Sequence, residues 1–239
     1  MDNAGYIGLS RQSGLMRELS TVANNIANIN TNGYRREANM FAEHVKALQN
    51  GDPSLSIATM TRRYVDLSAG DLTRTNNPLD VAIEGNGFFL VEAPQGERLT
   101  RDGAFSLNAQ GELVTSSGGR VLDESGGALV IPPGGGKISI TADGVINVGA
   151  QNVGKLGVVT TDPAFLIRVG QNQFRTEKGY EPALNTRVHQ FSLEGSNVSA
   201  VEELARLIEV QRTYEASKKF SDNDGERITR TVRALGQPK

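Results

Sequence analysis

The sequence has no cysteine and no tryptophan, and it is poor in large apolar residues. Without cysteine the chain can form no disulfide, no thiolate metal site and no cysteine nucleophile. It contains no run of about 18 apolar residues, so we expect no membrane-spanning helix. Hydrophobic residues make up 38% and aromatic residues 5% of the 239 positions, which is lean for one compact core. This composition favours an elongated chain that buries part of its surface against neighbours.

An excess of charge of one sign is also missing. With 25 basic and 27 acidic residues the net charge is −2, so no overall field attracts nucleic acid or an anionic membrane. Residues 1–13 contain no basic segment followed by an apolar stretch, so we expect no cleaved signal peptide. A protein with this N-terminus would leave the cytoplasm by another route.

Motifs for catalysis and for cofactor or metal binding are absent too. The two histidines, His44 and His189, lie far apart and outside any HExxH or triad-like pattern. The acidic segment 222–225 resembles a calcium loop, but Phe220 and Thr231 occupy positions where that loop requires other ligands. We therefore expect no catalytic, cofactor-binding or metal-binding residue and no small-molecule substrate.

Two basic pairs lie next to a tyrosine, Arg35-Arg36 and Arg62-Arg63. Neither pair extends into the larger basic patch that is typical of nucleic-acid sites. We interpret these arginines as solvated or interface residues and expect no nucleic-acid partner.

The first part of the chain has the periodicity of an amphipathic helix. Its apolar residues are spaced by four, three, four and three positions and form a stripe roughly 80° wide, which is typical of a coiled-coil seam. We expect this helix from about Gln12 to Asn30, with a stop near Asn32-Gly33. A shorter helix with Phe41, Val45 and Leu48 on one side is expected next. The predicted seam residues of the first helix are Leu15, Leu19, Val22, Ile26 and Ile29.

Asparagine is concentrated near the end of the first helix, although it is a mediocre helix former. If the helix continues, Asn24, Asn25, Asn28 and Asn32 lie within an arc of about 100° that faces away from the seam. Carboxamides both donate and accept hydrogen bonds, so such a stripe can be satisfied in a crowded interior without burying charge. We predict that these residues contact neighbouring subunits, and the alternative is a fraying, solvated helix end.

Residues 64–190 change to short alternating segments. Runs rich in Val, Ile, Leu, Phe and Thr are separated by Gly, Asn, Asp and Pro, which predicts short antiparallel strands and turns. Segments 106–114 and 139–147 repeat one pattern of strand, glycine-containing turn and strand. We expect both to be hairpins in one β domain.

From Ser196 onward the chain is predicted to be helical again. Ser199 and Glu202 form a capping box that indicates the helix start. Two apolar stripes lie on nearly opposite faces, so this helix needs two partners. Segment 222–225 is poor helix material, since its glycine costs about 1 kcal/mol relative to alanine, and the pattern allows a break there.

The two stripes receive different predicted partners. We expect the first stripe to pair with the N-terminal seam of the same chain; it consists of Val201, Leu204 and Ile208. We expect the second stripe to contact neighbouring subunits; it consists of Leu207, Val210, Tyr214, Ile228, Val232 and Leu235.

Together these patterns predict an elongated α+β protein. A mostly β central domain of antiparallel strands and hairpins is flanked by N- and C-terminal helices that pair as a coiled coil. The predicted divisions are an N-terminal helix in 1–34, a short helix and connecting arm in 35–75, the β domain in 76–190 and a C-terminal helix in 191–239.

Four blocks of the sequence are similar to the shared motifs of bacterial flagellar rod and hook proteins, and they occur in that family's order. They are ANNIANINTNGY at 23–34, LDVAIEGNGFF at 79–89, LTRDGAF at 99–105, and EGSNV at 194–198 with LIEVQRTYE at 207–215. Within the family, the start MDNAGYIGLS at 1–10 resembles the proximal-rod subunit.

The resemblance implies a structural role in the flagellar basal body. The paired terminal helices would line the inner tube of the axis, with the β domain outside. Copies of the chain would assemble helically with one another and with other rod proteins into the drive shaft that transmits torque for motility. The chain would be exported through the flagellar type III apparatus without a cleaved signal, into the rod that crosses the periplasm.

Other functions remain open from the sequence. The chain could be a distal-rod or hook-type axial protein of the same family. From another class, it could be a secreted β-rich binding module on a coiled-coil stalk. A hydrolase with scattered carboxylates has no support in the spacing of those residues.

Overall fold

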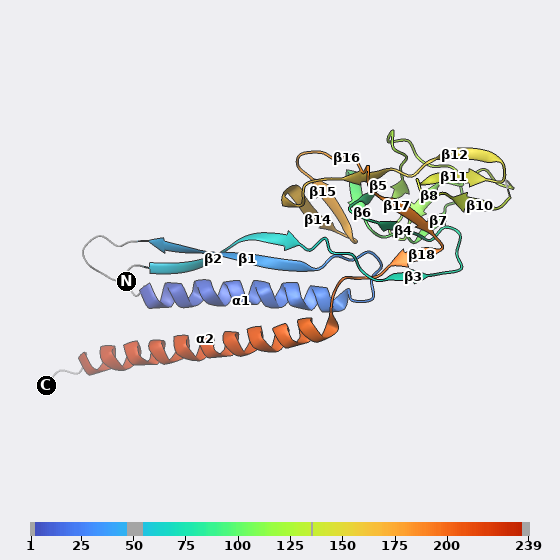
Figure 1. Ribbon diagram of the computed structural model, residues 1–239. Coiled ribbons are helices and arrows are strands. Elements are labelled where there is room, and N and C mark those ends of the chain that lie inside the picture. Colours follow the sequence, from blue (N-terminus) through green and yellow to red (C-terminus); the bar gives the residue numbers. More distant parts are fainter. Residues whose placement is uncertain (1–2, 47–54, 135, 236–239) are drawn as a thin grey trace. The chain divides into compact units, whose positions relative to one another are not determined.

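The structure, a computed structural model, describes the backbone of residues 3–46, 55–134 and 136–235 (Figure 1). Side chains in these ranges are described except at 3–7, 41–46, 55–62, 228, 231–232 and 234–235. The chain divides into two compact units. The helical unit comprises Met1–Ala27, Glu37–Tyr64 and Ser199–Lys239, and the β unit comprises Asn28–Arg36 and Val65–Val198. Both units therefore combine distant parts of the sequence, unlike the consecutive divisions that the sequence suggests.

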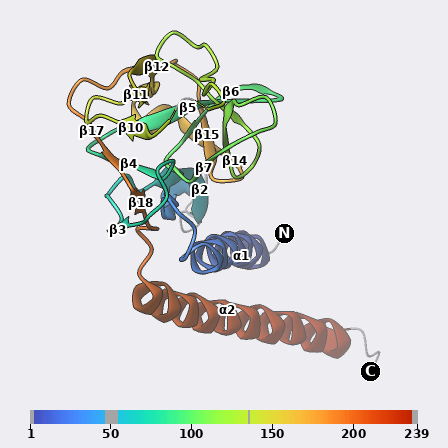
Figure 2. The ribbon, with the colours of Figure 1, turned by 90° about the vertical axis from the view of Figure 1, so that its right-hand side faces the viewer.

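In the helical unit, two long helices lie beside a two-stranded sheet. Helix α1 (Asn3–Ala27) packs against both α2 (Ala200–Leu235) and strand β1 (Glu37–Lys46), and β1 pairs with β2 (Leu55–Val65). Figures 1 and 2 show α1 between α2 and the two strands. Helices and mostly antiparallel strands in one chain confirm the predicted α+β class. The supercoiling of a coiled coil remains a prediction.

The predicted short helix after α1 is wrong, because residues 37–46 form strand β1. Phe41 and Val45 are four positions apart, a spacing that places two residues on one face of a helix and equally on one face of a strand. Pairing with β2, whose sequence LSIATMTRRYV is rich in strand-forming residues, selects the strand. The third position of the predicted helix, Leu48, lies outside the described residues.

Helix α1 ends at Ala27, earlier than the predicted stop near Asn32-Gly33. Turns replace the last helical turn, since Thr31 N donates to Asn28 O (3.1 Å) and Tyr34 N donates to Thr31 O (3.2 Å). Asn28 and Asn32 therefore lie beyond the helix and do not continue an asparagine stripe along it.

Helix α2 begins directly after Ser199, where the capping box predicts its start, and continues without a break through segment 222–225. Asp224 accepts a hydrogen bond from Arg227 one turn later (2.7 Å), and the Thr229 hydroxyl donates to Gly225 O (2.9 Å). These local contacts offset the roughly 1 kcal/mol cost of an internal glycine.

The β unit contains short strands that pair with antiparallel neighbours. Its largest sheet has the order β14-β15-β6-β5-β9-β8-β7, with β13 bound to both β5 and β16, and β10-β11-β12 form a smaller sheet. Two further pairs, β17 with β4 and β18 with β3, tie the C-terminal strands to the start of the unit. The strands are β3 (Leu72–Arg74), β4 (Val81–Glu84), β5 (Phe88–Ala93), β6 (Gly96–Thr100), β7 (Phe105–Leu107), β8 (Leu113–Thr115), β9 (Arg120–Val121), β10 (Ile138–Ile140), β11 (Val145–Val148), β12 (Gln151–Lys155), β13 (Val158–Thr160), β14 (Leu166–Gly170), β15 (Gln173–Thr176), β16 (Glu181–Pro182), β17 (Arg187–Gln190) and β18 (Ser192–Glu194).

The two predicted hairpins are confirmed. β7 pairs with β8, and β10 pairs with β11, each across a turn that contains a glycine with positive φ. Gly111 N donates to Asn108 O (3.0 Å) in the first turn, and Gly144 N donates to Thr141 O (2.9 Å) in the second. The repeated sequence pattern therefore encodes two turns with the same hydrogen bonding.

Strand β5 separates two hydrophobic clusters of the β unit. Phe89 packs edge-on against Phe105 in one cluster (ring centroids 5.0 Å apart), and Phe88 packs edge-on against Phe174 in the other (5.7 Å). Successive side chains of a strand point to opposite faces, so a run of consecutive apolar residues is needed where both faces are buried. The apolar run in β5 thus marks a central strand.

Candidate functional site

The face of α2 that packs on α1 repeats every three or four residues. Glu203 and Val210 are buried, and Leu207, Tyr214 and Ser217 are half-buried. Arg206, beside this face, forms an ion pair with Glu18 of α1. The second apolar stripe predicted for this helix therefore points into the chain.

This arrangement corrects the prediction that the first stripe forms the intramolecular seam. Val201, Leu204 and Ile208 are 79%, 49% and 50% exposed, whereas Val210, which was predicted to contact other subunits, is 3% exposed. Both stripes are apolar, so hydrophobicity alone does not select between them. The choice follows from Glu203, which lies on the second face and finds a buried partner, Asn25, only when that face turns inward.

The predicted seam residues of α1 differ in how deeply their side chains are buried. Val22 is buried, and Leu15, Leu19 and Ile26 are half-buried. Ile29 follows the end of the helix and belongs to the β unit, which separates it from the other four. The remaining predicted interface residues of α2, Ile228, Val232 and Leu235, have side chains outside the described residues.

Asn25 connects α1 to two other segments of the helical unit. Its Oδ1 accepts from Glu37 N (3.0 Å), and its Nδ2 donates to Glu37 O (2.9 Å) and to Glu203 Oε2 (3.2 Å). The side chain is fully buried. The structure thus places Asn25 inside the chain, which corrects its predicted role in contacts between subunits: the amide binds both backbone groups of Glu37 in β1.

The other predicted asparagines have different surroundings. Asn24 is exposed on α1, and Asn28 is half-buried and accepts from the Thr31 hydroxyl (3.1 Å). Asn32 accepts through its backbone oxygen from Asn172 Nδ2 (2.7 Å). The four residues do not form one surface, and contacts of Asn24, Asn28 and Asn32 with other subunits remain predictions.

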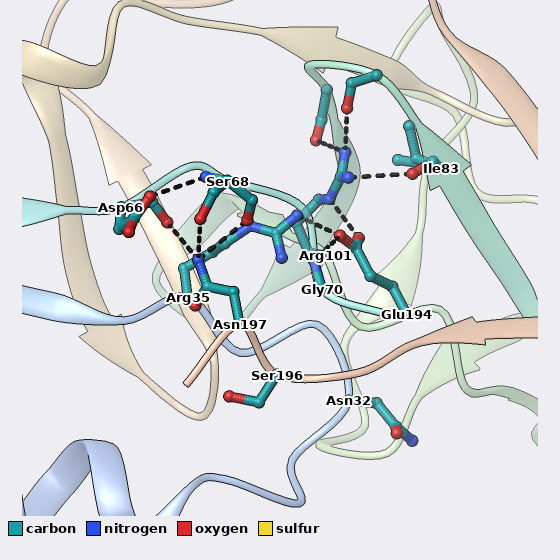
Figure 3. A network of polar contacts seen from close by, with 12 residues as sticks. Asn32, Arg35, Asp66, Ser68, Gly70, Ile83, Arg101, Glu194, Ser196 and Asn197 are labelled. Atoms are coloured by element: carbon teal, nitrogen blue, oxygen red, sulfur yellow. Dashed lines mark hydrogen bonds and ion pairs between the residues drawn. The ribbon is translucent and has the colours of Figure 1, made fainter. Parts of the chain in front are cut away.

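The β unit contains a buried polar cluster centred on Glu194, here called the clasp (Figure 3). Glu194 Oε1 accepts from Arg35 Nη2 (2.6 Å) and Gly70 N (3.0 Å), and Oε2 accepts from Arg101 Nε (2.8 Å). The side chains of the three charged residues are at most 3% exposed. One carboxylate therefore holds two arginines that are distant from it in the sequence.

Arg101 extends the clasp to the turn between β4 and β5. Its guanidinium donates to the backbone oxygens of Ile83 (3.0 Å), Gly85 (2.9 Å) and Gly87 (2.6 Å). Burial lowers the pKa of Arg101, and its hydrogen bond to Glu194 and the charge of that carboxylate oppose the shift. The turn is thus held by a charged group whose counter-charge, Glu194, lies inside the same unit.

Arg35 and Tyr34 anchor the N-terminal segment of the β unit. Arg168 stacks between the rings of Tyr34 and Phe174, at 4.4 Å and 4.6 Å from their centroids, and donates to Arg35 O. Such cation–π contacts stabilise by about 0.5–2 kcal/mol each. The expectation that Arg35 is solvated or at an interface is therefore wrong, because it is 1% exposed and bound to Glu194.

Asn197 adds further hydrogen bonds beside the clasp, at the C-terminal end of the unit. Its Oδ1 accepts from Arg36 N (2.7 Å), and its Nδ2 donates to Asp66 O (3.0 Å) and Ser68 O (2.9 Å). Figure 3 shows this amide beside Asp66 and Ser68. Asn197 thereby ties the residue before β1, Arg36, and the residue after β2, Asp66, to the segment that leads into α2.

Arg35, Arg101, Glu194 and Asn197 were not predicted as site residues. A signal was present, because Arg101, Glu194 and Asn197 lie within the similar blocks and Arg35 directly follows one. Blocks 79–89, 99–105 and 194–198 meet at the clasp, and Arg35 joins them from the position after block 23–34, a convergence that no local pattern reveals.

The clasp binds backbone groups through buried charged side chains. In the described part of the chain no group of three or more His, Cys, Asp or Glu side chains could hold a metal ion. His189 pairs with Glu84 at the surface (2.7 Å). Across the described helices, none has both the length and the apolarity needed to cross a membrane.

Comparison with known protein families gives three matches along the chain. Residues 6–35 match the flagella basal body rod protein family, residues 82–148 match the flagellar hook protein FlgE/F/G D1 domain, and residues 189–226 match the flagellar basal body rod FlgEFG protein C-terminal family. The three matches contain Arg35, Arg101 and Glu194 respectively.

Similar full-length proteins are flagellar as well. The chain is 42% identical to the flagellar basal-body rod protein FlgF of Caulobacter vibrioides and 34% identical to that of Mesorhizobium japonicum, over 99% of both chains in each case. It is 32% identical to the flagellar basal-body rod protein FlgG of Buchnera aphidicola, over 84% of this chain and 87% of the relative.

Proposed function

The chain belongs to the family of flagellar basal-body rod proteins, and from this we propose that it is a proximal-rod subunit whose copies stack helically into the shaft that transmits torque. It is a structural subunit of the flagellar basal body. The observation that carries the proposal is the 42% identity to a rod protein over 99% of both chains, from end to end.

The proximal position is favoured over the distal-rod or hook-type alternative by the extent of the matches. Relatives named FlgF align over 99% of both chains, whereas the FlgG relative aligns over 84% of this chain and a hook protein of Rhizobium meliloti over 48%. A shared length supports a shared place in the shaft, because each layer of a rod must accommodate the dimensions of its subunits.

The distribution of apolar side chains supports an assembling role. One face of α2 packs within the chain, while Val201, Leu204 and Ile208 on the other face are exposed. A helix that is apolar on two faces requires a second partner. A stalked binding module would need a separate binding surface, and its helices would need no second apolar face.

We also propose that export through the flagellar type III apparatus delivers the chain to the rod, and that it carries out no catalysis. The family relationship supports both statements. The coiled-coil pairing of α1 and α2 at the inner wall of the shaft belongs to the same proposal, and it is supported by their packing against each other.

A clean deletion of the gene tests the proposal. We expect loss of swimming, with basal bodies that electron microscopy shows to stop at a truncated rod, and recovery when the gene is supplied in trans. Swimming cells with complete rods would refute it. A rod that is complete in its proximal part and lacks only the distal part would favour the distal-rod alternative.

A further inference from the structure

Helix α2 carries two complementary surfaces at different positions along its length. The first is the exposed stripe of Val201, Leu204 and Ile208 near its start. The second is a groove of about 660 Å³ formed with α1, more than a full turn further along. The groove is lined by Gly8, Arg11, Arg212, Thr213, Ala216, Ser217 and Phe220.

The groove has the character of a helix-binding surface. Its lining residues on α2 are small or apolar at Ala216, Ser217 and Phe220, and Phe220 is 63% exposed. Gly8 has no atom within 4 Å of the position that a Cβ would occupy, so the backbone of α1 is open to a close approach there. Small residues at a surface let a second helix approach closely, and an exposed phenylalanine offers it apolar area.

The charges of the two surfaces are opposite. Among the exposed side chains of residues 199–211, Glu202 and Glu209 outnumber Arg206, a net charge of −1, because Glu203 is buried against α1. Residues 212–220 contain Arg212, Lys218 and Lys219 against Glu215 alone, a net charge of +2. The groove gains a further cation from Arg11.

We propose that the exposed stripe of one copy of this chain docks in the groove of the next copy, in a head-to-tail contact. This inference rests on the proposed function, which requires copies of the chain to stack. In-register pairing of two parallel copies would place like charges opposite each other, whereas an offset places the acidic segment against the basic one. A contact between two different surfaces forms a ring if its rotation closes and an open helical array if it does not, and a stacked shaft requires the open array.

The proposal specifies which residues meet. Leu204 of one copy lies against Ala216 of the next, and Glu202 lies near Arg11 and Arg212 of that copy. Within one chain, Leu204 and Ala216 are about 18 Å apart along α2 at 1.5 Å per residue. A short crosslink between these two positions can therefore form only between copies.

The absence of cysteine makes this contact directly testable. The variant Leu204→Cys/Ala216→Cys is expressed in place of the native chain, and isolated basal bodies are oxidised to form disulfides. We expect a ladder of products at multiples of the chain mass. Neither single variant should give a product, and the control Leu204→Cys/Glu226→Cys, which places the second cysteine at an exposed position outside the groove, should give none.

Other outcomes overturn the proposal in distinguishable ways. Dimers without larger products would indicate a closed pair, and crosslinking of Leu204→Cys alone would indicate contact between identical stripes. A product with the combined mass of this chain and a different, cysteine-containing rod protein would overturn the proposal in favour of a contact with that protein. Absence of the wild-type chain from basal bodies would refute the proposed function itself, whereas its presence without a ladder would refute only this contact.

Charge reversal gives an independent measurement should the cysteine variant fail to incorporate. We expect Arg212→Glu to lower the amount of chain in basal bodies at least tenfold, and Glu202→Arg combined with Arg212→Glu to restore part of it. Unchanged incorporation of Arg212→Glu would overturn the proposal. So would a double variant that incorporates no better than Arg212→Glu, provided that its circular dichroism spectrum is normal.

Discussion

The β unit and the helical unit differ in how complete their surfaces are. The β unit pairs its buried arginines with Glu194 internally, at the clasp, and encloses two hydrophobic clusters. The helical unit satisfies its buried polar groups through Asn25 and Glu203 but leaves Val201, Leu204 and Ile208 in solvent. The β unit also exposes apolar residues, among them Leu184 at 90%, but on α2 these three exposed apolar residues lie along one helix face and offer a continuous surface for an assembled state.

The largest expected effect comes from removing the carboxylate of the clasp. Glu194→Gln leaves Arg35 and Arg101 buried without a counter-charge, and loss of one partner of a buried ion pair costs about 3–5 kcal/mol. Hydrogen exchange should therefore accelerate in β5 and β6, while α1 and α2 keep their protection. The control Glu181→Gln, at an exposed glutamate of the same unit, should leave exchange unchanged. Equal effects of the two variants would show that the clasp does not stabilise β5 and β6.

A smaller loss is expected from Gly33→Ala. This glycine has φ +64°, and a Cβ on it would lie 2.3 Å from the backbone carbon of Arg101. The left-handed conformation alone costs an L-residue about 1–2 kcal/mol, and the overlap adds to it. Gly118→Ala isolates the conformational part, because Gly118 has φ +83° and open space around it. Urea unfolding should show the larger loss for Gly33→Ala, and equal losses would mean that close packing at Arg101 is unimportant.

The third variant acts on the helical unit. Asn25→Ala leaves backbone groups of Glu37 and the carboxylate of Glu203 without this partner, and an unsatisfied buried polar group costs about 1–3 kcal/mol. Ser20→Ala, at an exposed position of the same helix, should change stability by no more than about 0.5 kcal/mol. Thermal unfolding followed by circular dichroism at 222 nm, a wavelength that reports helix, measures both. A shift in the β unit instead would show that the units are not separate.

The smallest expected effect is a pH dependence in the β unit. Burial raises the pKa of Asp102 above its ordinary value of 3.8, against opposing hydrogen bonds from Ala104 N and the Ser116 hydroxyl. A carboxyl group with a raised pKa binds its proton more tightly in the folded state. Its contribution to stability is therefore fully present below 3.8 and is lost as the pH rises through its folded pKa.

Asp102→Asn removes this titration while keeping the shape of the side chain. Relative to the native chain, the variant should gain stability as the pH is raised from about 4 to about 7, the range above the ordinary pKa of an aspartate. Urea midpoints of both proteins at several pH values measure the difference. A difference that does not change with pH would contradict the assignment.

Much of the fold could be predicted from local patterns. The start of α2 at Ala200, the two glycine hairpins and the buried run of β5 each follow from a few neighbouring residues. The identity of β1 could not be predicted in this way, because Phe41 and Val45 fit one face of either element and the decision comes from β2.

The candidate sites were less predictable because they depend on contacts across the sequence. The two stripes of α2 are equally apolar, and the partner of Glu203, Asn25, lies 178 residues away. The clasp similarly joins residues that appear solvated or unremarkable when each is considered with its neighbours. Periodicity identifies which faces exist, but the buried polar pairs decide which face turns inward.

The sequence separation within the clasp has a consequence for the time course of folding. Arg35 and its partner Glu194 are 159 residues apart, and contacts of such long range form late because the intervening loop must first be closed. A chain that emerges with its N-terminus first cannot complete the β unit until Glu194 has also emerged. On the proposed export route the clasp would therefore delay completion of this unit until nearly the whole chain is free, and the segments before Glu194 would stay extended until then.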